Sequence, residues 1–509
     1  MGTWNYQRAK EKIEARLEQV KTVEIVDYTR ETSLTSIPSN RAYRMDAVHL
    51  YVDILNMSEM LDSTDVEGET CHKRTLRFLN LHYRAARRIL AECGAIRVDF
   101  HNQRLHAVIA KPYGEEDEPT RVHKAVAIGQ LLIDVLAETG DYDEHIADAN
   151  VRIGIDTGQA LAVNNGRHGN REPLFLGKPA NLAAKLASNG SNVGIYLSDE
   201  AREAISLKAL GGDKPYSTPL TAEQIEDSQE IASLPVTTDD IVEEWREDNE
   251  ANPIGAFEFT RPTPPLSSLD ITKLTPSNSK RTEAVSVYAD LDGFTAYVGA
   301  HIDDNAEDVV RCLHVIRSEM DRVITADFDG RRIRFIGDCV HGLLLEGTAQ
   351  TTDVEKTIST AVLCAGGLRS SFELALKVLS DDGGDVDNLG LSIGLEFGPM
   401  AVSRLGMQGD RVRCAVSRGV LASEAEQKGC DGTETAIGPD AYAAGSEAVR
   451  QVFGKRRQCV GLTYDVAVEA LTAERDTTAK AAAAAAYAVS SPALARSIER
   501  PLQPHANAK

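Results

Sequence analysis

The chain has 509 residues, so two or three domains are expected, and its formal net charge of −22 argues against broad nucleic-acid binding, which needs a basic surface. No apolar run is long enough to span a membrane, and the charged N-terminus lacks the apolar core of a signal peptide. Eight cysteines are scattered without a Cys-x-x-Cys pair, so neither a zinc site nor a disulfide framework is indicated. These features predict a reduced, cytoplasmic protein.

An N-terminal helical extension is expected over residues 1–42, where "RAKEKIEARLEQVKTVEIV" has amphipathic spacing suited to packing on the body of the protein or on a partner. A first domain is expected over residues 43–260, in the order strand, long helical stretch, hairpin, helix, strand, helix. Its acidic segment, residues 221–250, is interpreted as a solvated excursion.

A linker rich in Pro, Ser and Thr is expected over residues 261–282. A second domain follows over residues 283–470 with the same order of elements, beginning with the alternating, β-branched stretch "VSVYADL". The chain then ends in a low-complexity tail, residues 471–509.

Three pairs of segments recur in the same order in the two domains, which indicates an internal repeat. The pairs are "HLYVDILNMSEML" (49–61) with "SVYADLDGFTAYV" (286–298), "GAIRVDFHNQRLHAVI" (94–109) with "RRIRFIGDCVHGLL" (331–344), and "VRIGIDTGQALAV" (151–163) with "LSIGLEFGPMAVS" (391–403). Two tandem α/β domains of one fold are therefore predicted, each an α+β sandwich with helices over an antiparallel sheet.

Two acids of the second domain stand at the ends of predicted strands. Asp290 ends an apolar strand, and Asp338 lies in the turn of a hairpin, so the two carboxylates converge if those strands are neighbours. Like charges that close repel unless cations lie between them, and oxygen-only ligands suit Mg²⁺ or Mn²⁺. Gly293 allows backbone N–H groups to approach a phosphate. The set predicts phosphoryl or nucleotidyl transfer; the alternative is a helix cap at Asp290 and a simple tight turn at Asp338.

The stretches "VYADLDGFTAYV" and "RIRFIGDCVHGLL" closely resemble the class III nucleotide cyclases, the adenylyl and guanylyl cyclase family, over approximately residues 45–200 and 284–425. The resemblance implies the ferredoxin-like class III cyclase fold and a head-to-tail pairing of the two domains as an intramolecular pseudo-heterodimer, without need of a second chain. It also implies two divalent ions, Mg²⁺ or Mn²⁺, and a nucleoside triphosphate substrate.

Carried onto this sequence, the family pattern implies one composite site. The second half supplies the metal ligands Asp290, Asp338 and the backbone carbonyl of Leu291, and the substrate-binding turn Gly293, Phe294 and Thr295. The first half supplies the catalytic pair Asn181 and Lys185, where Lys185 replaces the family's Arg and offers a point charge without the planar fork.

The mirror site is expected to be inactive, a remnant or a regulatory pocket. There the first half keeps Asp53 but has Gln103 in place of the second acid, and Arg413 and Ser417 are expected at the positions of the Asn-x-x-x-Arg pair.

Four further residues of the first half are expected to bind the base. Asp99 stands where adenylyl cyclases carry Lys, and an ionised carboxylate only accepts hydrogen bonds, which argues against ATP but leaves uracil, cytosine and guanine open. The family's second base-recognition position corresponds to Leu174 in this sequence. Tyr51 shares the strand face of Asp53 and narrows the pocket, and Arg97, on the face of Asp99, donates to a pyrimidine carbonyl. The alternative for Tyr51 is ordinary strand packing.

The twin domains and the "VDFHNQRLHAV" stretch are similar to the bacterial pyrimidine cyclases of the Pycsar antiphage systems, which implies a cyclic UMP or cyclic CMP signal, made on infection and detected by a separate effector protein. UTP is the preferred substrate, followed by CTP and then the purine nucleotides. A diguanylate cyclase or polymerase palm is an alternative, although "GGDVDN" (383–388) is expected in a loop rather than a hairpin. A nucleotide-binding pseudocyclase is the non-enzymatic alternative.

Overall fold

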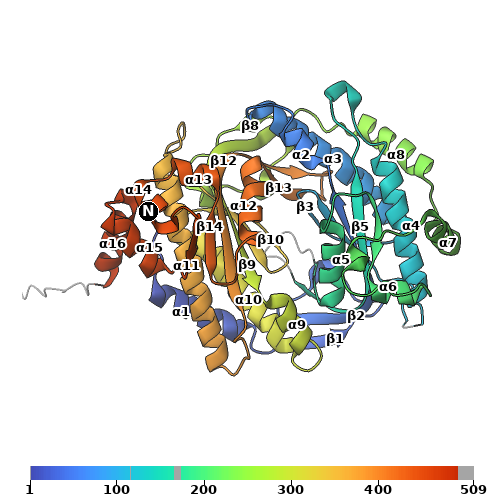
Figure 1. Cartoon of the computed structure of the whole chain (residues 1–509), viewed down its shortest axis with the longest axis horizontal. Helices are drawn as coiled ribbons and strands as arrows, with labels where there is room; N and C mark the ends of the chain where they lie inside the picture. Colours follow the sequence, from blue (N-terminus) through green and yellow to red (C-terminus); the bar gives the residue numbers. More distant parts are fainter. Residues whose placement is uncertain (1, 115, 165–172, 491–509) are drawn as a thin grey trace, which may run out of the picture.

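The computed structural model describes residues 2–114, 116–164 and 173–490 and consists of two mixed α/β halves facing each other (Figure 1). Each half is built on one mainly antiparallel sheet with long helices packed against it. The prediction of two tandem domains of one fold is confirmed. None of the helices within these ranges is both long and apolar enough to cross a bilayer.

The first half contains a seven-stranded sheet of order β3-β4-β2-β5-β6, with β1 parallel to β2 and β7 parallel to β5. Its strands are β1 (Glu24–Asp27), β2 (Arg41–Ile54), β3 (Ile96–His101), β4 (Arg104–Ile109), β5 (Val151–Asn164), β6 (Pro173–Leu176) and β7 (Gly194–Leu197). Its helices are α2 (Met57–Leu61), α3 (Glu69–Glu92), α4 (Glu118–Leu136), α5 (Lys178–Ser188), α6 (Asp199–Ala204), α7 (Ala222–Ala232) and α8 (Thr238–Ala251).

The alternation of β2 positions its chemistry. Leu50, Val52 and Ile54 are buried in one apolar cluster with residues of α3 and α4. Tyr51 and Asp53 therefore project from the opposite face of the sheet.

The second half contains an eight-stranded sheet of order β10-β11-β9-β12-β14-β15, with β13 antiparallel to β12 and β8 parallel to β9. Its strands are β8 (Phe259–Thr260), β9 (Ser279–Asp292), β10 (Arg331–Ile336), β11 (Cys339–Leu344), β12 (Gly390–Leu405), β13 (Val412–Val416), β14 (Glu434–Ile437) and β15 (Gln458–Val460). Its helices are α9 (Phe294–His301), α10 (Ala306–Arg322), α11 (Val354–Asp381), α12 (Arg418–Lys428), α13 (Pro439–Ala444), α14 (Glu447–Phe453), α15 (Tyr464–Ala473) and α16 (Thr477–Ser490). The "GGDVDN" segment lies in the loop between α11 and β12, as expected.

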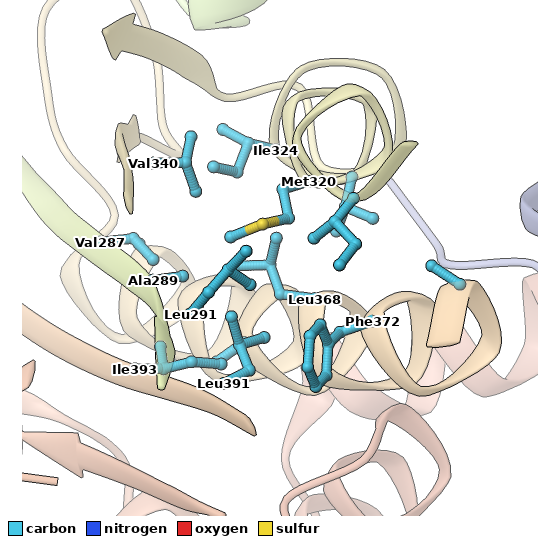
Figure 2. Packing of buried hydrophobic residues seen from close by; sticks show 14 of the residues in the cluster. Val287, Ala289, Leu291, Met320, Ile324, Val340, Leu368, Phe372, Leu391 and Ile393 are labelled. Atoms are coloured by element: carbon cyan, nitrogen blue, oxygen red, sulfur yellow. The ribbon is translucent and has the colours of Figure 1, made fainter. Parts of the chain in front are cut away.

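The core of the second half lies between β9 and the helices α10 and α11. Figure 2 shows Ala289 and Leu291 of β9 packed with Met320 of α10 and with Leu368 and Phe372 of α11. The intervening side chain of β9, Asp290, consequently faces away from this core.

The acidic segment 221–250 folds back on the first half, so the interpretation as a solvated excursion is wrong. It forms α7 and α8, and α8 buries Ile241, Val242 and Trp245 on one face. The indole Nε1 of Trp245 donates a hydrogen bond to the carbonyl of Leu81 in α3 at 3.2 Å. The acidic residues of α8 keep its outer face polar, and its apolar residues, which recur about one turn apart, pack against the first half.

The N-terminal extension packs on the body of the protein. Its helix α1 (Tyr6–Gln19) contacts the second half, where Arg8 pairs with Glu319 and Asp327. Its strand β1 instead joins the first sheet. Of the expected tail, residues 471–473 end α15 and residues 477–490 form α16, while residues 491–509 lie outside the described residues.

Candidate active site between the two halves

The two acidic residues predicted to bind metal in the second half lie at the same end of neighbouring strands. Asp338 occupies the two-residue turn between β10 and β11, where Gly337 has a φ of +59°. Strand β11 pairs with β9, with Val340 opposite Ala289, so this turn lies beside Asp290. The convergence expected from the sequence is therefore present.

The charges of these two acids are coupled. Removal from water is the main cause that raises the pKa of Asp338 well above its ordinary value, and the charge of Asp290 raises it further. Burial also raises the pKa of Asp290 to about 6, while Lys428 opposes the shift. A divalent cation relieves this repulsion, and carboxylate and carbonyl oxygens are the ligands that Mg²⁺ and Mn²⁺ prefer. The donor set of Asp290, Asp338 and the Leu291 carbonyl thus fits such an ion.

No group of three or more His, Cys, Asp or Glu side chains suited to a metal occurs within the described ranges. Two carboxylates without a third are nevertheless what magnesium sites commonly offer, because substrate phosphates and water complete the coordination.

We expect protonation of these two acids to increase the folding stability of the metal-free protein as the pH falls from about 7.5 to 5.5. Their folded-state pKa values lie above the ordinary value of 3.8, so the folded protein holds protons that the unfolded chain releases. The Asp338→Asn variant lacks one of the two charges, so at pH 7.5 it should melt at a higher temperature than the unchanged protein. The increase should be about 2–4 °C for each kcal/mol of charge repulsion that is removed.

Thermal melts in a chelator at both pH values, repeated with Mg²⁺, check this. The difference between the two proteins should shrink at the lower pH, and Mg²⁺ should stabilise the unchanged protein more than the variant. A difference that is independent of pH contradicts the coupling.

The turn after β9 has the backbone shape expected of a phosphate-binding loop. Gly293 has a φ of +78°, and a Cβ there would lie 2.5 Å from the carbonyl oxygen of Asn388, so only glycine fits. The side chain of Phe294 is buried in the core and packs on Tyr297. Thr295 is exposed in the first turn of α9.

Asn181 joins the first half to this loop. It lies in α5, and its Nδ2 donates a hydrogen bond to Oγ1 of Thr295 in α9 at 3.1 Å. Lys185 is exposed one helical turn later, on the same side of α5. The structure therefore brings the predicted pair of the first half to the loop that follows the acids of the second half.

The positions equivalent to this pair in the second half were misplaced by sequence reasoning. Helices α5 and α12 both have 11 residues, so Leu421 and Ala425 occupy the places of Asn181 and Lys185. Gly154 contacts α5 at the same positions along the helix at which Gly394 contacts α12.

The expectation of Arg413 and Ser417 is thus wrong, because Arg413 lies in β13 and Ser417 caps α12. The conclusion that the second half lacks the pair holds with the corrected residues, which are both apolar.

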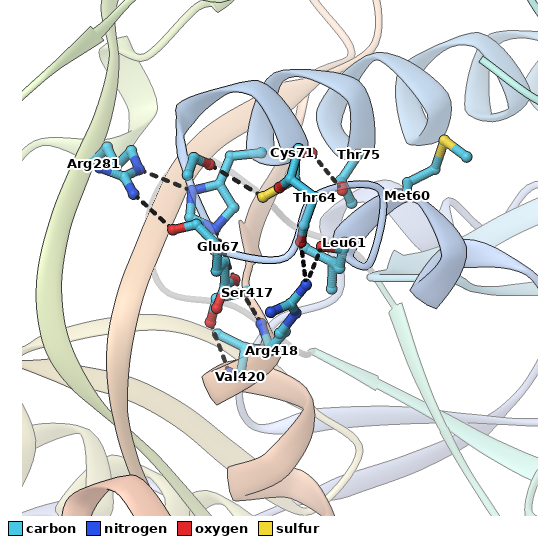
Figure 3. A network of polar contacts seen from close by, with 12 residues as sticks. Met60, Leu61, Thr64, Glu67, Cys71, Thr75, Arg281, Ser417, Arg418 and Val420 are labelled. Carbon is cyan, nitrogen blue, oxygen red and sulfur yellow. Dashed lines mark hydrogen bonds and ion pairs between the residues drawn. The ribbon is translucent and has the colours of Figure 1, made fainter. Parts of the chain in front are cut away.

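A polar network closes the mirror side of the interface (Figure 3). Arg418, at the start of α12, donates through Nη2 to the carbonyls of Leu61 and Thr64 at 3.0 and 2.7 Å, and its backbone N–H donates to Glu67 at 2.7 Å. Arg281 of β9 donates to the carbonyl of Glu67 at 3.2 Å. These bonds attach the loop after α2 firmly to the second half.

Two of the predicted base-binding residues are engaged by the other half. Asp99 pairs with Arg334 of β10, which also donates to the carbonyl of Phe100 at 2.6 Å. Arg97 pairs with Asp410 at 2.7 Å and donates to the hydroxyl of Tyr83. A register shift between Arg97 and Asp99 interrupts the regular alternation of β3, so the expectation that they share a face on that basis is wrong. We assign Arg97 to the interface.

Tyr51 belongs to a cluster of contacting aromatic side chains. Its ring stacks on His106 at 4.1 Å between centroids, and His106 lies 6.0 Å from Phe175. In the second half, Tyr288 and His341 stack in the same way, and the Tyr288 hydroxyl lies 3.5 Å from Nδ2 of Asn102 in the first-half turn. By this pseudo-twofold relation, Tyr51 faces the turn that carries Asp338.

Leu174 is buried in an apolar cluster that also contains Phe294 of the second half. Its side chain packs and offers no hydrogen bond. Sequence reasoning missed His106, Phe175 and Arg334, because only cross-strand and cross-half contacts connect them to the predicted residues.

The comparisons with known proteins agree with this fold. The adenylate and guanylate cyclase catalytic domain family matches residues 42–217. Over 509 residues the chain is 57% identical to a uridylate cyclase from Pseudomonas aeruginosa, covering 100% of this chain and 98% of that protein. It is 39% identical over 442 residues to a uridylate cyclase from a Rhizobium species, covering 83% of each. A crystal structure of a class III adenylyl cyclase-like ATP-binding protein from Pseudomonas aeruginosa matches with a TM-score of 0.91 at 57% identity, covering 92% of this chain and 100% of that chain.

Proposed function

This chain belongs to the class III nucleotide cyclases, and we propose that this nucleotide cyclase converts UTP into 3′,5′-cyclic UMP and pyrophosphate. The observation that carries the proposal is the hydrogen bond between Asn181 of the first half and Thr295 of the second. It supports a single composite site in which Asn181 and Lys185 of the first half act together with the loop that follows Asp290.

In this site Asp290, Asp338 and the carbonyl of Leu291 would hold two divalent ions, Mg²⁺ or Mn²⁺. When bound, such ions lower the pKa of the ribose 3′-hydroxyl and neutralise the triphosphate and the leaving pyrophosphate. The turn formed by Gly293, Phe294 and Thr295 presents backbone N–H groups to the phosphates.

The first half acts on the ribose and the reacting phosphorus. Asn181 hydrogen-bonds the ribose and orients the 3′-hydroxyl for in-line attack on the α-phosphorus. Lys185 stabilises the negative charge that develops on the α-phosphate in the transition state.

Similarity to known proteins and two features of the first half support UTP. The two uridylate cyclases above share 57% and 39% identity with most of this chain. We expect the ring of Tyr51, which stacks on His106, to narrow the space for a base on that face. Arg334 pairs with Asp99 and keeps it ionised, and an ionised carboxylate can accept a hydrogen bond from N3–H of uracil.

CTP, GTP and ATP are the alternative substrates. CTP offers the same ring size. ATP is a candidate because the matching crystal structure is of an ATP-binding protein. We further propose that the product is detected by a separate effector protein in antiviral defence, on the resemblance to the Pycsar cyclases.

The test is a product assay in which the purified full chain is incubated separately with UTP, CTP, GTP and ATP, with Mn²⁺ or Mg²⁺, and the products are identified by mass. Cyclic UMP is the expected main product, and the Asp338→Asn variant should yield none. Cyclic CMP or a cyclic purine nucleotide as the main product would replace UTP in the proposal. Nucleotide binding without pyrophosphate release from any of the four would indicate a pseudocyclase.

A further inference from the structure

The mirror site contains an arginine side chain between its acids. Arg104 is directly opposite Asp53 in the pairing of β2 with β4, and its Nε lies 3.5 Å from Oδ2 of Asp53. Its Nη1 donates to Oε1 of Glu424, on α12 of the other half, at 2.6 Å. Lys428 contacts the same carboxylate oxygen at 2.7 Å. The guanidinium thus bridges one carboxylate from each half.

We infer that the guanidinium of Arg104 occupies the place that a divalent cation takes in the composite site, so that the mirror site is filled by a cation of the protein itself. Metal is excluded from it by this charge as well as by the loss of an acid at Gln103. The comparison with the composite site rests on the proposed function.

The equivalent residue in the second half shows what has changed. Asp338 and Cys339 follow Gly337 in the turn of the composite site, as Gln103 and Arg104 follow Asn102 in the mirror site. Cys339 stands in the place of Arg104, and its short side chain is buried beside Asp290 and Asp338. Arg104 is long enough to cross the interface to Glu424.

The surroundings of the bridge favour the ion pair of Arg104 with Glu424, whereas burial raises the pKa of Asp53 despite the nearby charge of Arg104. The side chains of Asp53 and Glu424 are only 8% and 13% exposed, and that of Arg104 is 28% exposed. Burial raises the pKa of Glu424, but the charges of Arg104 and Lys428 outweigh it and hold that pKa well below its ordinary value. A buried carboxylate pair of this kind needs a cation, and here the chain provides it.

Mn²⁺ binding to reconstructed mirror sites tests the inference. All variants carry Asp338→Asn, which weakens Mn²⁺ binding at the composite site, so that an added site in the mirror position can be counted. Binding is measured without nucleotide, by electron paramagnetic resonance of the free Mn²⁺. Gln103→Asp/Arg104→Ala should bind about one additional Mn²⁺ per chain, at least about tenfold more tightly than the background protein. Gln103→Asp/Arg104→Met, which keeps an apolar stem at this position, is measured in parallel in case the alanine variant fails to fold.

Two controls separate the charge of Arg104 from the missing acid. Gln103→Asp alone and Gln103→Asp/Arg104→Lys both keep a cation beside the restored acid, and neither should gain Mn²⁺. A gain in either control overturns the inference, as does the absence of a gain in both charge-removing variants when melting curves show that they are folded. The readout involves no turnover, so a different substrate or an inactive composite site leaves its outcome unaffected.

Discussion

Replacing Asp338 by Asn is expected to reduce cyclase turnover by at least about a thousand-fold, since metal activation contributes several kcal/mol and each 1.4 kcal/mol is about tenfold in rate. Asn keeps the size of the side chain and removes the charge that pairs with a divalent ion. Asp338 lies in a two-residue turn beside Asp290, so the change leaves the flanking strands β10 and β11 intact. Steady-state product formation over a range of Mg²⁺ and Mn²⁺ concentrations measures the loss.

Gln103→Ala is the matched control, because Gln103 occupies the equivalent turn of the first half. It should keep turnover within about threefold, as expected for a residue away from the chemistry. If it abolished turnover as completely as Asp338→Asn, both sites would take part and the assignment of a single composite site would be wrong.

The second large effect is expected at Asn181, where Asn181→Ala should lower turnover by about 10²–10³-fold, the usual cost of removing one positioned hydrogen-bond donor. The amide projects from α5 toward the loop of the second half, where it donates to Thr295. It is partly exposed, so truncation leaves the apolar face of α5 in place. Single-turnover measurements with saturating substrate separate the chemical step from nucleotide binding.

Leu421→Ala is the matched control for this variant, since Leu421 occupies the same place in α12. It should affect stability more than turnover. Unchanged turnover in Asn181→Ala would remove the first half from the chemistry, and the proposed mechanism would then have to rely on the second half alone.

Several features of the protein could be predicted from the order of residues along the chain. The repeat of Tyr-x-Asp and of the hairpin segments predicted two domains of one fold, because equivalent patterns of apolar residues bury equivalent faces. The convergence of Asp290 and Asp338 also followed, since a strand end and a hairpin turn in one antiparallel sheet are neighbours. The proposed composite site could be expected because each half had lost what the other kept.

Contacts between residues far apart in the sequence decided the remaining features. The register of α12 against its sheet placed Leu421 and Ala425, rather than Arg413 and Ser417, opposite the first half. The pairing of Asp99 with Arg334 joins residues of opposite halves, and no local pattern encodes it.

The bridge from Arg104 to Glu424 is of the same kind. A long charged side chain in a strand predicts only that it seeks a partner or water, and the partner is determined by how the two halves dock. Whether a degenerate site is an empty pocket or an ion pair therefore becomes visible only in the folded molecule.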